Sequence, residues 1–325
     1  MKLASLKSNG RDGELIIVDR SNSRYIPVPD VAITMQQAIE NWSSCEGDLE
    51  GIYQSLNRGE IRGQELDISL LASPLPRAYQ WLDGSAYLSH VERVRKARGA
   101  EMPPSFLDDP LMYQGGADVF LAPTDPIPLK DPAWGGDFEA EVAVVVDDVP
   151  MGVSEADAAA HIKLVMLVND VSLRNLIPNE LAKGFGFIHG KPPTAFSPFA
   201  LTLGELGEAW REGKIHLPLV THLNEKRFGD PNAGVDMQFG FPRLVSHAAK
   251  TRPLSAGTII GSGTISNYDQ ERGCSCLAER RVIEIVEQGQ AQTPFLAQGD
   301  HVRIEMFDAD GQSLFGAIDQ VVTPC

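Results

Sequence analysis

The chain has 325 residues, a length that suggests two domains of about 150 residues each or one larger domain. With 43% hydrophobic and 22% charged residues, its composition is that of a folded globular protein and excludes a disordered or collagen-like chain. The 28 Lys and Arg against 44 Asp and Glu give a net charge of -16, which disfavours nucleic acid and anionic membranes as partners. An anionic substrate would therefore need a local group of cations, or a metal ion.

The first elements that the pattern predicts are two short strands, at residues 14–18 and 24–28, joined by a turn. Thr34 then provides an N-cap for a helix that reaches Asn41, because apolar residues follow it at helical spacing. These elements form a small, mixed N-terminal unit.

Two prolines near residue 75 interrupt regular structure, because proline removes a hydrogen-bond donor and disfavours helix before it. We place a domain boundary there, between a small N-terminal domain (1–75) and a larger domain (76–325). In the larger domain we expect strands at 139–146, 163–169, 217–224, 258–264, 280–286, 301–307 and 314–322. We expect helices at 84–98, 154–162 with Ser154 as N-cap, and 237–250. Strands and helices do not alternate regularly, which indicates an α+β fold with antiparallel or mixed sheets.

No apolar run approaches the ~20 residues that cross a bilayer, and the first residues lack the apolar stretch of a signal peptide. We therefore expect a cytoplasmic protein with no membrane partner. In that compartment we expect free thiols at the four cysteines, Cys45, Cys274, Cys276 and Cys325.

Glu139 and Glu141 stand two residues apart at the start of a strand, so both side chains project from one face. The Val-Ala-Val-Val-Val run that follows indicates that this strand enters the interior. Two close carboxylates repel each other unless a proton or a cation lies between them, and burying their charge is also unfavourable. A divalent metal ion would offset both costs. The alternative is a solvated strand end, which is the commoner setting for an isolated pair of this kind.

Asp170 ends a second apolar segment, a position from which a carboxylate can join the same site. Three hard oxygen ligands suit Mg²⁺, Mn²⁺ or Ca²⁺ and do not suit zinc. The alternative is that Asp170 only caps the following turn.

Asp83 and His90 are seven residues apart in a segment predicted to be helical, so two turns bring them to one face. A histidine beside a metal-bound carboxylate could take a proton from water at neutral pH. The alternative is an ordinary histidine on a helix surface, which the local sequence alone favours.

Two further segments are rich in small residues. The loop from Gly184 to Phe199 carries one cation, Lys191, among glycines and prolines that let the backbone approach a ligand. The turn from Gly261 to Asp269 has neither the spacing of a phosphate-binding loop nor that of a dinucleotide fingerprint.

In chain order, the motifs D-x6-H, E-x-E, N-D-x-S-x-R, G-K-x-x-T-x-x-S-P and G-S-G-T-I-S resemble those of the fumarylacetoacetate hydrolase family over about residues 80–322. The resemblance implies a mixed β-roll catalytic domain behind a small N-terminal domain, in a homodimer. It also implies enzymes that act on β-diketo or 2-oxo acids with Mg²⁺ or Ca²⁺, with Mn²⁺ as a further option. The residue roles it implies are metal ligands at Asp83, Glu139, Glu141 and Asp170, a base at His90, cations for substrate oxygens at Arg174 and Lys191, and Thr194 beside the metal.

The chain departs from the family pattern near the base. Where the family's hydrolases place a glutamate after the G-T-I-S turn to orient the histidine, this chain has Asp269, with Glu92 or Glu271 as substitutes. Relatives that decarboxylate or isomerise often have an H-x-x-E pair, whereas Arg93 follows His90 here, which favours the hydrolase branch.

The resulting hypothesis is a metal-dependent hydrolase that cleaves a C–C bond in a β-diketo acid, such as fumarylacetoacetate or an acylpyruvate, in the catabolism of aromatic compounds. His90, held by Asp269, would deprotonate water, while Arg174, Lys191 and a further cation at Arg98 would bind the small anionic substrate. The alternatives are a 2-oxo acid decarboxylase or isomerase on the same metal site, or a non-catalytic metal-binding protein.

Overall fold

The computed structural model describes residues 1–97 and 104–324. Within these residues the largest sheet has 11 strands, in the order β4-β3-β2-β1-β13-β10-β9-β18-β5-β6, with β12 paired to β10. Its strands are β1 (Lys2–Leu6), β2 (Glu14–Val18), β3 (Arg24–Pro27), β4 (Gln64–Glu65), β5 (Trp81–Gly84), β6 (Met112–Gly115), β9 (Ala140–Val146), β10 (Ile162–Asn169), β12 (Ala195–Phe196), β13 (Ala200–Thr202) and β18 (Thr258–Gly261). The sheet is mixed, because β5 and β18 run parallel while their other neighbours are antiparallel.

A second, five-stranded sheet packs against the first. In spatial order it contains β17 (Lys226–Gly229), β16 (Leu219–Leu223), β19 (His301–Met306), β20 (Ile318–Thr323) and β7 (Ile127–Pro128). Two small ribbons pair β8 (Gly136–Asp137) with β11 (Ser172–Leu173), and β14 (Trp210–Arg211) with β15 (Lys214–Ile215).

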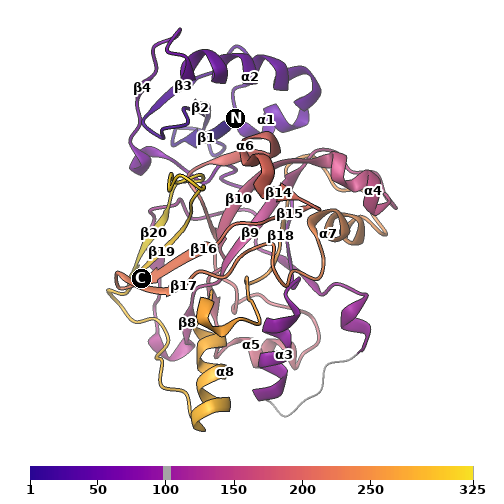
Figure 1. Cartoon of the computed structure of the whole chain (residues 1–325), viewed down its shortest axis with the longest axis vertical. Coiled ribbons are helices and arrows are strands. Elements are labelled where there is room, and N and C mark those ends of the chain that lie inside the picture. Colours follow the sequence, from indigo (N-terminus) through magenta and orange to yellow (C-terminus); the bar gives the residue numbers. More distant parts are fainter. Residues whose placement is uncertain (98–103, 325) are drawn as a thin grey trace.

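The helices surround the sheets and gather toward both ends of the molecule (Figure 1). The α-helices are α1 (Met35–Glu40), α2 (Trp42–Asn57), α3 (Leu88–Ala97), α4 (Glu155–Ala158), α5 (Ile177–Leu181), α6 (Leu203–Leu206), α7 (Phe241–Ala248) and α8 (Leu277–Gln288). The short 3₁₀ turns are η1 (Ile68–Leu70), η2 (Pro104–Leu107), η3 (Pro132–Trp134), η4 (Ala159–His161), η5 (Gly207–Ala209) and η6 (Gln270–Arg272). Figure 1 shows α1 and α2 at the N-terminal end and α3, α5 and α8 at the opposite end.

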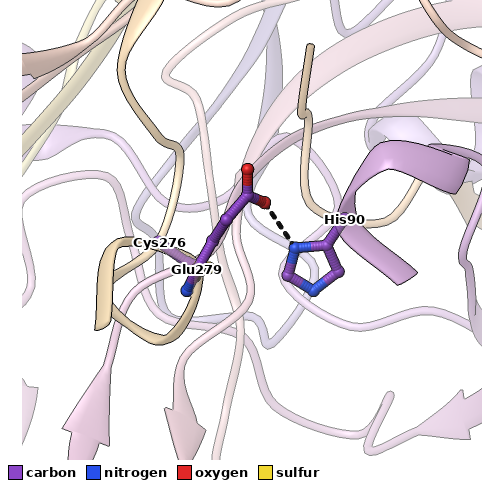
Figure 2. A group of neighbouring side chains, drawn as sticks. All are labelled: His90, Cys276 and Glu279. Carbon is purple, nitrogen blue, oxygen red and sulfur yellow. Dashed lines mark hydrogen bonds and ion pairs between the residues drawn. The ribbon is translucent and has the colours of Figure 1, made fainter. Parts of the chain in front are cut away.

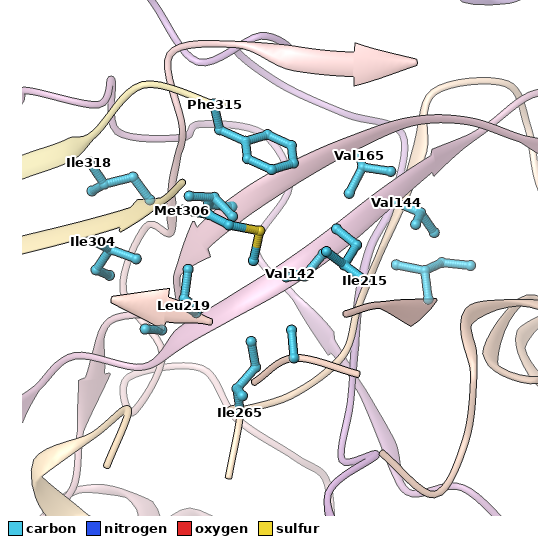
Figure 3. Close-up of a cluster of buried hydrophobic side chains, with 14 of the residues drawn as sticks. Val142, Val144, Val165, Ile215, Leu219, Ile265, Ile304, Met306, Phe315 and Ile318 are labelled. Atoms are coloured by element: carbon cyan, nitrogen blue, oxygen red, sulfur yellow. The ribbon is translucent and has the colours of Figure 1, made fainter. Parts of the chain in front are cut away.

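The main core lies between the two sheets (Figure 3), where Val142 and Val144 of β9 meet Leu219 of β16 and Ile304 of β19. The alternate residues of β9, such as Val145, face a second buried cluster on the other side of the sheet. Both faces of β9 are therefore covered, which explains its continuous apolar sequence. Each fully buried valine of this kind contributes about 1.5–3 kcal/mol of hydrophobic stabilisation.

The N-terminal strands continue the large sheet, because β1 pairs antiparallel with both β2 and β13. Helix α2 packs against β2 and buries Leu49 and Tyr53 in the second cluster. The sheet thus runs without interruption from the N-terminal region to the strands that carry the acidic motifs.

The predicted α+β class is confirmed, and the strands expected at 14–18, 139–146 and 163–169 lie within one or two residues of their predicted positions. Thr34 and Ser154 are N-caps, accepting hydrogen bonds from Gln37 N and Asp157 N. The cysteines in the described residues are free and buried, as expected, and Cys325 lies outside the described residues. No helix among the described residues is long and apolar enough to cross a membrane.

The strand predicted at 280–286 is wrong, since these residues lie inside helix α8. The run Val282-Ile283-Glu284-Ile285-Val286 is β-branched and suggested a strand, but an N-cap at Cys276 and a left-handed Gly289 after the last turn define a helix. The segment from residue 84 is also different, because Trp81–Gly84 is strand β5 and helix α3 begins only at Leu88. The final strand begins at Ile318, not at residue 314.

Candidate active site

Four buried carboxylates meet at one end of the large sheet. Asp83 lies on β5, Glu141 on β9, Glu139 one residue before β9 and Asp170 one residue after β10. One ligand atom from each lies within 4.8 Å of the others. The sequence prediction that Glu139, Glu141 and Asp170 share a site is therefore matched by the geometry, and Asp83 joins them.

Strand register explains this arrangement. Val168 of β10 pairs with Glu141 of β9, so the end of β10 delivers Asp170 beside the glutamates. On the other side, β18 lies between β9 and β5, and its Gly261 pairs with both Ala143 and Asp83. A methyl group at Gly261 would lie 2.3 Å from Asp83 Oδ1, so only glycine leaves room for this carboxylate.

The cluster holds more negative charge than its neighbours neutralise. Burial, and then the charge of Asp170, raise the pKa of Asp83 well above its ordinary value. Burial raises the pKa of Glu141 in the same way, followed by the charges of Asp83 and Glu139. Both carboxyls are thus driven toward the protonated form in the absence of a further cation.

Two cations reach the cluster and bind its outer members. Lys191 Nζ donates to Glu139 Oε2 and Asp170 Oδ2, each at 2.5 Å, and Arg174 Nη2 donates to Glu139 Oε1 at 2.7 Å. Burial alone would raise the pKa of Glu139, but the charges of Arg174 and Lys191 outweigh it and lower that pKa. Glu139 is therefore the carboxylate of the cluster that stays ionised most readily.

Asp170 receives further hydrogen bonds that fix its orientation. Thr194 Oγ1 donates to Asp170 Oδ1 at 2.8 Å, which agrees with the position beside the metal site expected for Thr194. Tyr113 Oη donates to Asp170 Oδ2 at 2.5 Å, a contact that the sequence did not predict.

The residues fit a hard divalent cation. Both oxygens of Glu141 are buried and have no hydrogen-bond partner among the described residues, although a buried carboxylate normally has several. Four converging carboxylates without sulfur suit Mg²⁺, Ca²⁺ or Mn²⁺, and a bound cation would remove the repulsion that raises the pKa values of Asp83 and Glu141.

Next to the cluster, His90 of α3 pairs with Glu279 of α8 (Figure 2). His90 Nδ1 and Glu279 Oε2 are 2.6 Å apart, and Glu279 is completely buried while the His90 side chain is 16% exposed. One ligand atom from each of His90, Cys276 and Glu279 lies within 4.8 Å of the others, and Cys276 forms a β-bridge with Glu139, which brings the pair next to the carboxylates. Within residues 1–97 and 104–324, Nε2 of the His90 ring has no hydrogen-bond partner and can meet a water or a substrate.

Two predictions about His90 are wrong. Asp83 and His90 do not share a helical face, because Asp83 lies on β5 and reaches the site from the sheet. Asp269 does not hold His90; its carboxylate caps the turn η6 by accepting from Glu271 N, and it is exposed. Glu279 takes the orienting position that was assigned to Asp269, and neither Glu92 nor Glu271 is its partner. Arg98 lies outside the described residues.

Glu279 was missed because its segment was assigned to a strand. The signal that could have located it is Cys276-x-x-Glu279 before an apolar run, which has the spacing of a helix capping box. In the structure, Cys276 Sγ does accept from Glu279 N at 3.3 Å. Burial raises the pKa of Cys276 well above its usual value, so this thiol serves as a cap and not as a charged ligand.

Asp137 connects the two parts of the site. Its carboxylate accepts from Leu277 N and Ala278 N, the first amides of α8, at 2.7 and 2.9 Å. The same carboxylate accepts from Arg174 Nε at 2.8 Å. An anion at a helix N-terminus is favourable, and here it also holds Arg174 beside Glu139.

Two family models together match nearly the whole chain. The model described as fumarylacetoacetate (FAA) hydrolase C-terminal matches residues 80–323, and the model described as fumarylacetoacetase N-terminal domain 2 matches residues 1–77. The chain belongs to the fumarylacetoacetate hydrolase family. The proteins that resemble this chain include a hydrolase, an isomerase and a tautomerase.

Curated relatives are distant and match over part of their length. A fumarylacetoacetase of Arabidopsis thaliana is 24% identical over 86% of this chain and 69% of its own. A 2,4-didehydro-3-deoxy-L-rhamnonate hydrolase of Sphingomonas sp. is 28% identical over 48% of this chain and 53% of its own. An oxaloacetate tautomerase of Bacillus subtilis is 26% identical over 60% of this chain and 62% of its own. The chain thus matches between about half and about two thirds of the length of these proteins.

Solved structures share the fold over the whole chain. A fumarylacetoacetate hydrolase from Exiguobacterium antarcticum has a TM-score of 0.69 at 16% identity, covering 100% of both chains. A maleylpyruvate hydrolase from Sphingobium sp., in complex with manganese(II) and pyruvate, has a TM-score of 0.66 at 16% identity over 100% of this chain and 99% of its own.

Proposed function

We propose that this protein is a metal-dependent hydrolase that cleaves the C–C bond of a β-diketo acid, such as fumarylacetoacetate or an acylpyruvate. The observation that carries the proposal is the partly buried His90–Glu279 pair beside four converging carboxylates. A base with an orienting acid is what water activation requires, and a carboxylate cluster is what a metal-bound diketone requires.

Asp83, Glu139, Glu141 and Asp170 would hold the ion, which is Mg²⁺ or Ca²⁺ in the proposal, with Mn²⁺ as a third option. When bound, such an ion polarises the two oxygens of a 1,3-dicarbonyl group and stabilises negative charge that develops on them. Thr194 and Tyr113 keep Asp170 in place through their hydrogen bonds, so one side of the site is fixed before substrate enters.

His90 would take a proton from water through Nε2, because Nδ1 is bound to Glu279. The hydroxide attacks the acyl carbonyl carbon, the bond between that carbon and the neighbouring carbon breaks, and the electron pair leaves as an enolate. The proton that His90 removed is then available to the enolate carbon. The acyl part becomes a carboxylic acid, and the other part becomes a 2-oxo or 3-oxo acid.

Lys191 and Arg174 would hold oxygens of the substrate. Both are held at the cluster by carboxylates, and their side chains are 8% and 18% exposed, so little water competes for them. Preorganised donors of this kind are worth about 3 kcal/mol each at a developing oxyanion. They also provide the local positive charge that an anionic substrate needs on a chain with a net charge of -16.

The test is a panel of acylpyruvates and other β-diketo acids, with oxaloacetate included, each with Mg²⁺, Ca²⁺ or Mn²⁺. Loss of the enol absorbance with formation of two acids supports the proposal. Conversion of oxaloacetate alone would assign the site to a decarboxylase or tautomerase; the Bacillus subtilis relative is an oxaloacetate tautomerase. Metal-dependent stability without any turnover would assign a non-catalytic metal-binding role.

Three wider parts of the hypothesis belong to the same proposal. A role in aromatic-compound catabolism follows from a fumarylacetoacetate-type substrate, and the cytoplasm is the compartment in which we place it. A homodimer is expected from the family resemblance, and light scattering on the purified protein measures it directly.

A further inference from the structure

Glu279 has a second charged partner, Arg93, which the proposed reaction has not used. Arg93 Nη1 donates to Glu279 Oε1 at 2.5 Å, while His90 Nδ1 binds the other oxygen of the same carboxylate at 2.6 Å. We propose that Arg93 is a positioning residue that locks Glu279 in place beside His90 and offsets the charge of that carboxylate next to the imidazole. The proposal rests on the role proposed above for His90.

The geometry makes one carboxylate a bridge between an imidazole and a guanidinium. His90 and Arg93 are three residues apart on α3, so they lie on the same face of that helix. This face meets the first turn of α8, where Glu279 is completely buried and the Arg93 side chain is 14% exposed. Each oxygen of Glu279 therefore has a defined and different partner.

Arg93 also ties Glu279 to a third segment. Its Nη1 donates to Ser266 Oγ at 3.0 Å and its Nη2 to the Asn267 carbonyl at 2.7 Å. Ser266 Oγ in turn donates to Glu279 Oε1 at 2.8 Å. The guanidinium thus joins α3, α8 and the turn after β18, a geometry that a planar fork provides and a lysine ammonium does not.

Charged groups lie near His90 on two sides. Glu279 binds it from α8, and Glu139, just before β9, forms a β-bridge with Cys276 next to this pair. Cys276, also on the α8 side, adds no charge, because burial raises its pKa well above the usual value. Arg93 is the cation on the other side of Glu279, and its positive charge partly offsets that of the carboxylate.

Glu279 nevertheless keeps its charge. Burial would raise the pKa of Glu279, but the hydrogen bond from His90 and the charges of His90 and Arg93 outweigh burial and lower it. The carboxylate therefore remains an acceptor for His90 Nδ1 across the neutral range.

The experiment compares Arg93→Gln, Arg93→Lys and Arg280→Gln. Arg280 follows Glu279 on α8 and lies over the Phe228 ring, 5.6 Å from its centroid, so its variant controls for the loss of one positive charge nearby. We expect the acid limb of kcat/KM in Arg93→Gln to move to higher pH by about one unit, which is a roughly tenfold loss near neutrality that recovers in alkali. Arg93→Lys should leave the acid limb of kcat/KM at the wild-type pH but lower kcat by about threefold. Arg280→Gln should have the kcat and the pH profile of wild type.

A purely structural role would lower activity equally at every pH, and that result would overturn the proposal. A second readout needs no turnover: ¹³C-labelled histidine spectra, with the His90 signal assigned by its loss in His90→Gln, give the titration midpoint of the imidazole. An unchanged midpoint in Arg93→Gln also overturns the proposal. If wild type cleaves no diketo acid but the midpoint shifts, the proposed function fails and the inference about Arg93 stands. If Arg93→Gln does not fold, Arg93→Met keeps the aliphatic stem and serves instead.

Discussion

The candidate site consists of two halves that are built differently. The carboxylate half comes from strands β5, β9 and β10, with β18 between β9 and β5, so backbone hydrogen bonds set the position of every carboxylate. The base half comes from α3 and α8, two helices whose residues His90 and Glu279 are 189 positions apart in sequence. One half is fixed by register and the other by side-chain contacts.

The two halves also differ in how their charges are balanced. In the carboxylate half, Glu141 has no partner for either oxygen among the described residues, and burial raises its pKa. In the base half, each oxygen of Glu279 has a partner, and the pKa of Glu279 is lowered. Among the described residues, the first half has an unpaired carboxylate that a cation would neutralise, whereas both oxygens of Glu279 in the second half have partners.

Glu141→Ala should give the largest effect, because it removes a ligand from the half that needs a cation. We expect kcat/KM to fall by about 10³-fold, since the metal's contribution to the barrier is several kcal/mol. Activity measured over a metal titration, with circular dichroism to show that the variant is folded, tests this. Full activity of the variant in the presence of a chelator would remove Glu141 from the site.

His90→Ala should damage the base half alone. We expect a loss of about 10²–10⁴-fold in kcat with metal affinity unchanged, since a positioned general base contributes in that range. Isothermal titration with the metal, beside steady-state kinetics, separates the two halves. A kcat within about threefold of wild type would mean that a different group activates water.

Glu279→Gln and Asp269→Asn form a matched pair. The first removes the charge that orients His90 and should lower kcat by about 10²-fold, whereas the second touches only the exposed cap of η6 and should change kcat by less than about twofold. The two kcat values under the same conditions decide between the acids. The reverse order would restore Asp269 as the orienting residue.

The smallest effect that we predict is on stability. Glu141 has a raised pKa in the folded protein, so without metal the folded state binds more protons than the unfolded chain, and stability falls as pH rises from below the ordinary carboxyl pKa through the raised value. Glu141→Gln removes this penalty. With a chelator present, its Tm should exceed that of wild type by about 3 °C or more at pH 8, and by less at pH 4. Equal differences at both pH values would show that Glu141 does not carry the charge.

What could be predicted from the sequence differs between the carboxylate half and the base half of the site. Glu139, Glu141 and Asp170 could be predicted because alternation and apolar runs specify strand faces and strand ends. The partner of His90 could not, since nothing local links residue 90 to residue 279. The β-branched run of α8 also pointed to a strand, and tertiary packing overrode that propensity. Asp83 was found through the family motif, although the helical spacing first used to explain it was wrong.

The role of Gly261 is visible only in the structure. The sequence shows a turn of small residues after a strand, and only the packing shows that a side chain there would occupy the space of Asp83 Oδ1. Its requirement is steric, since its backbone is not in the left-handed region. Such a requirement depends on a neighbour from another strand and leaves no pattern in the local sequence.

Asp137 gives the two halves a common support. The buried carboxylate of Asp137 accepts hydrogen bonds from the first two amides of α8 and from Nε of Arg174. A substitution that displaces Arg174 from Glu139 therefore also disturbs the helix that presents Glu279, and the reverse holds equally. Effects measured at Arg174 and at Glu279 should not add, although the two side chains serve different steps. A related chain with a base other than His90 would still have to keep Asp137, or change both the start of α8 and Arg174 together.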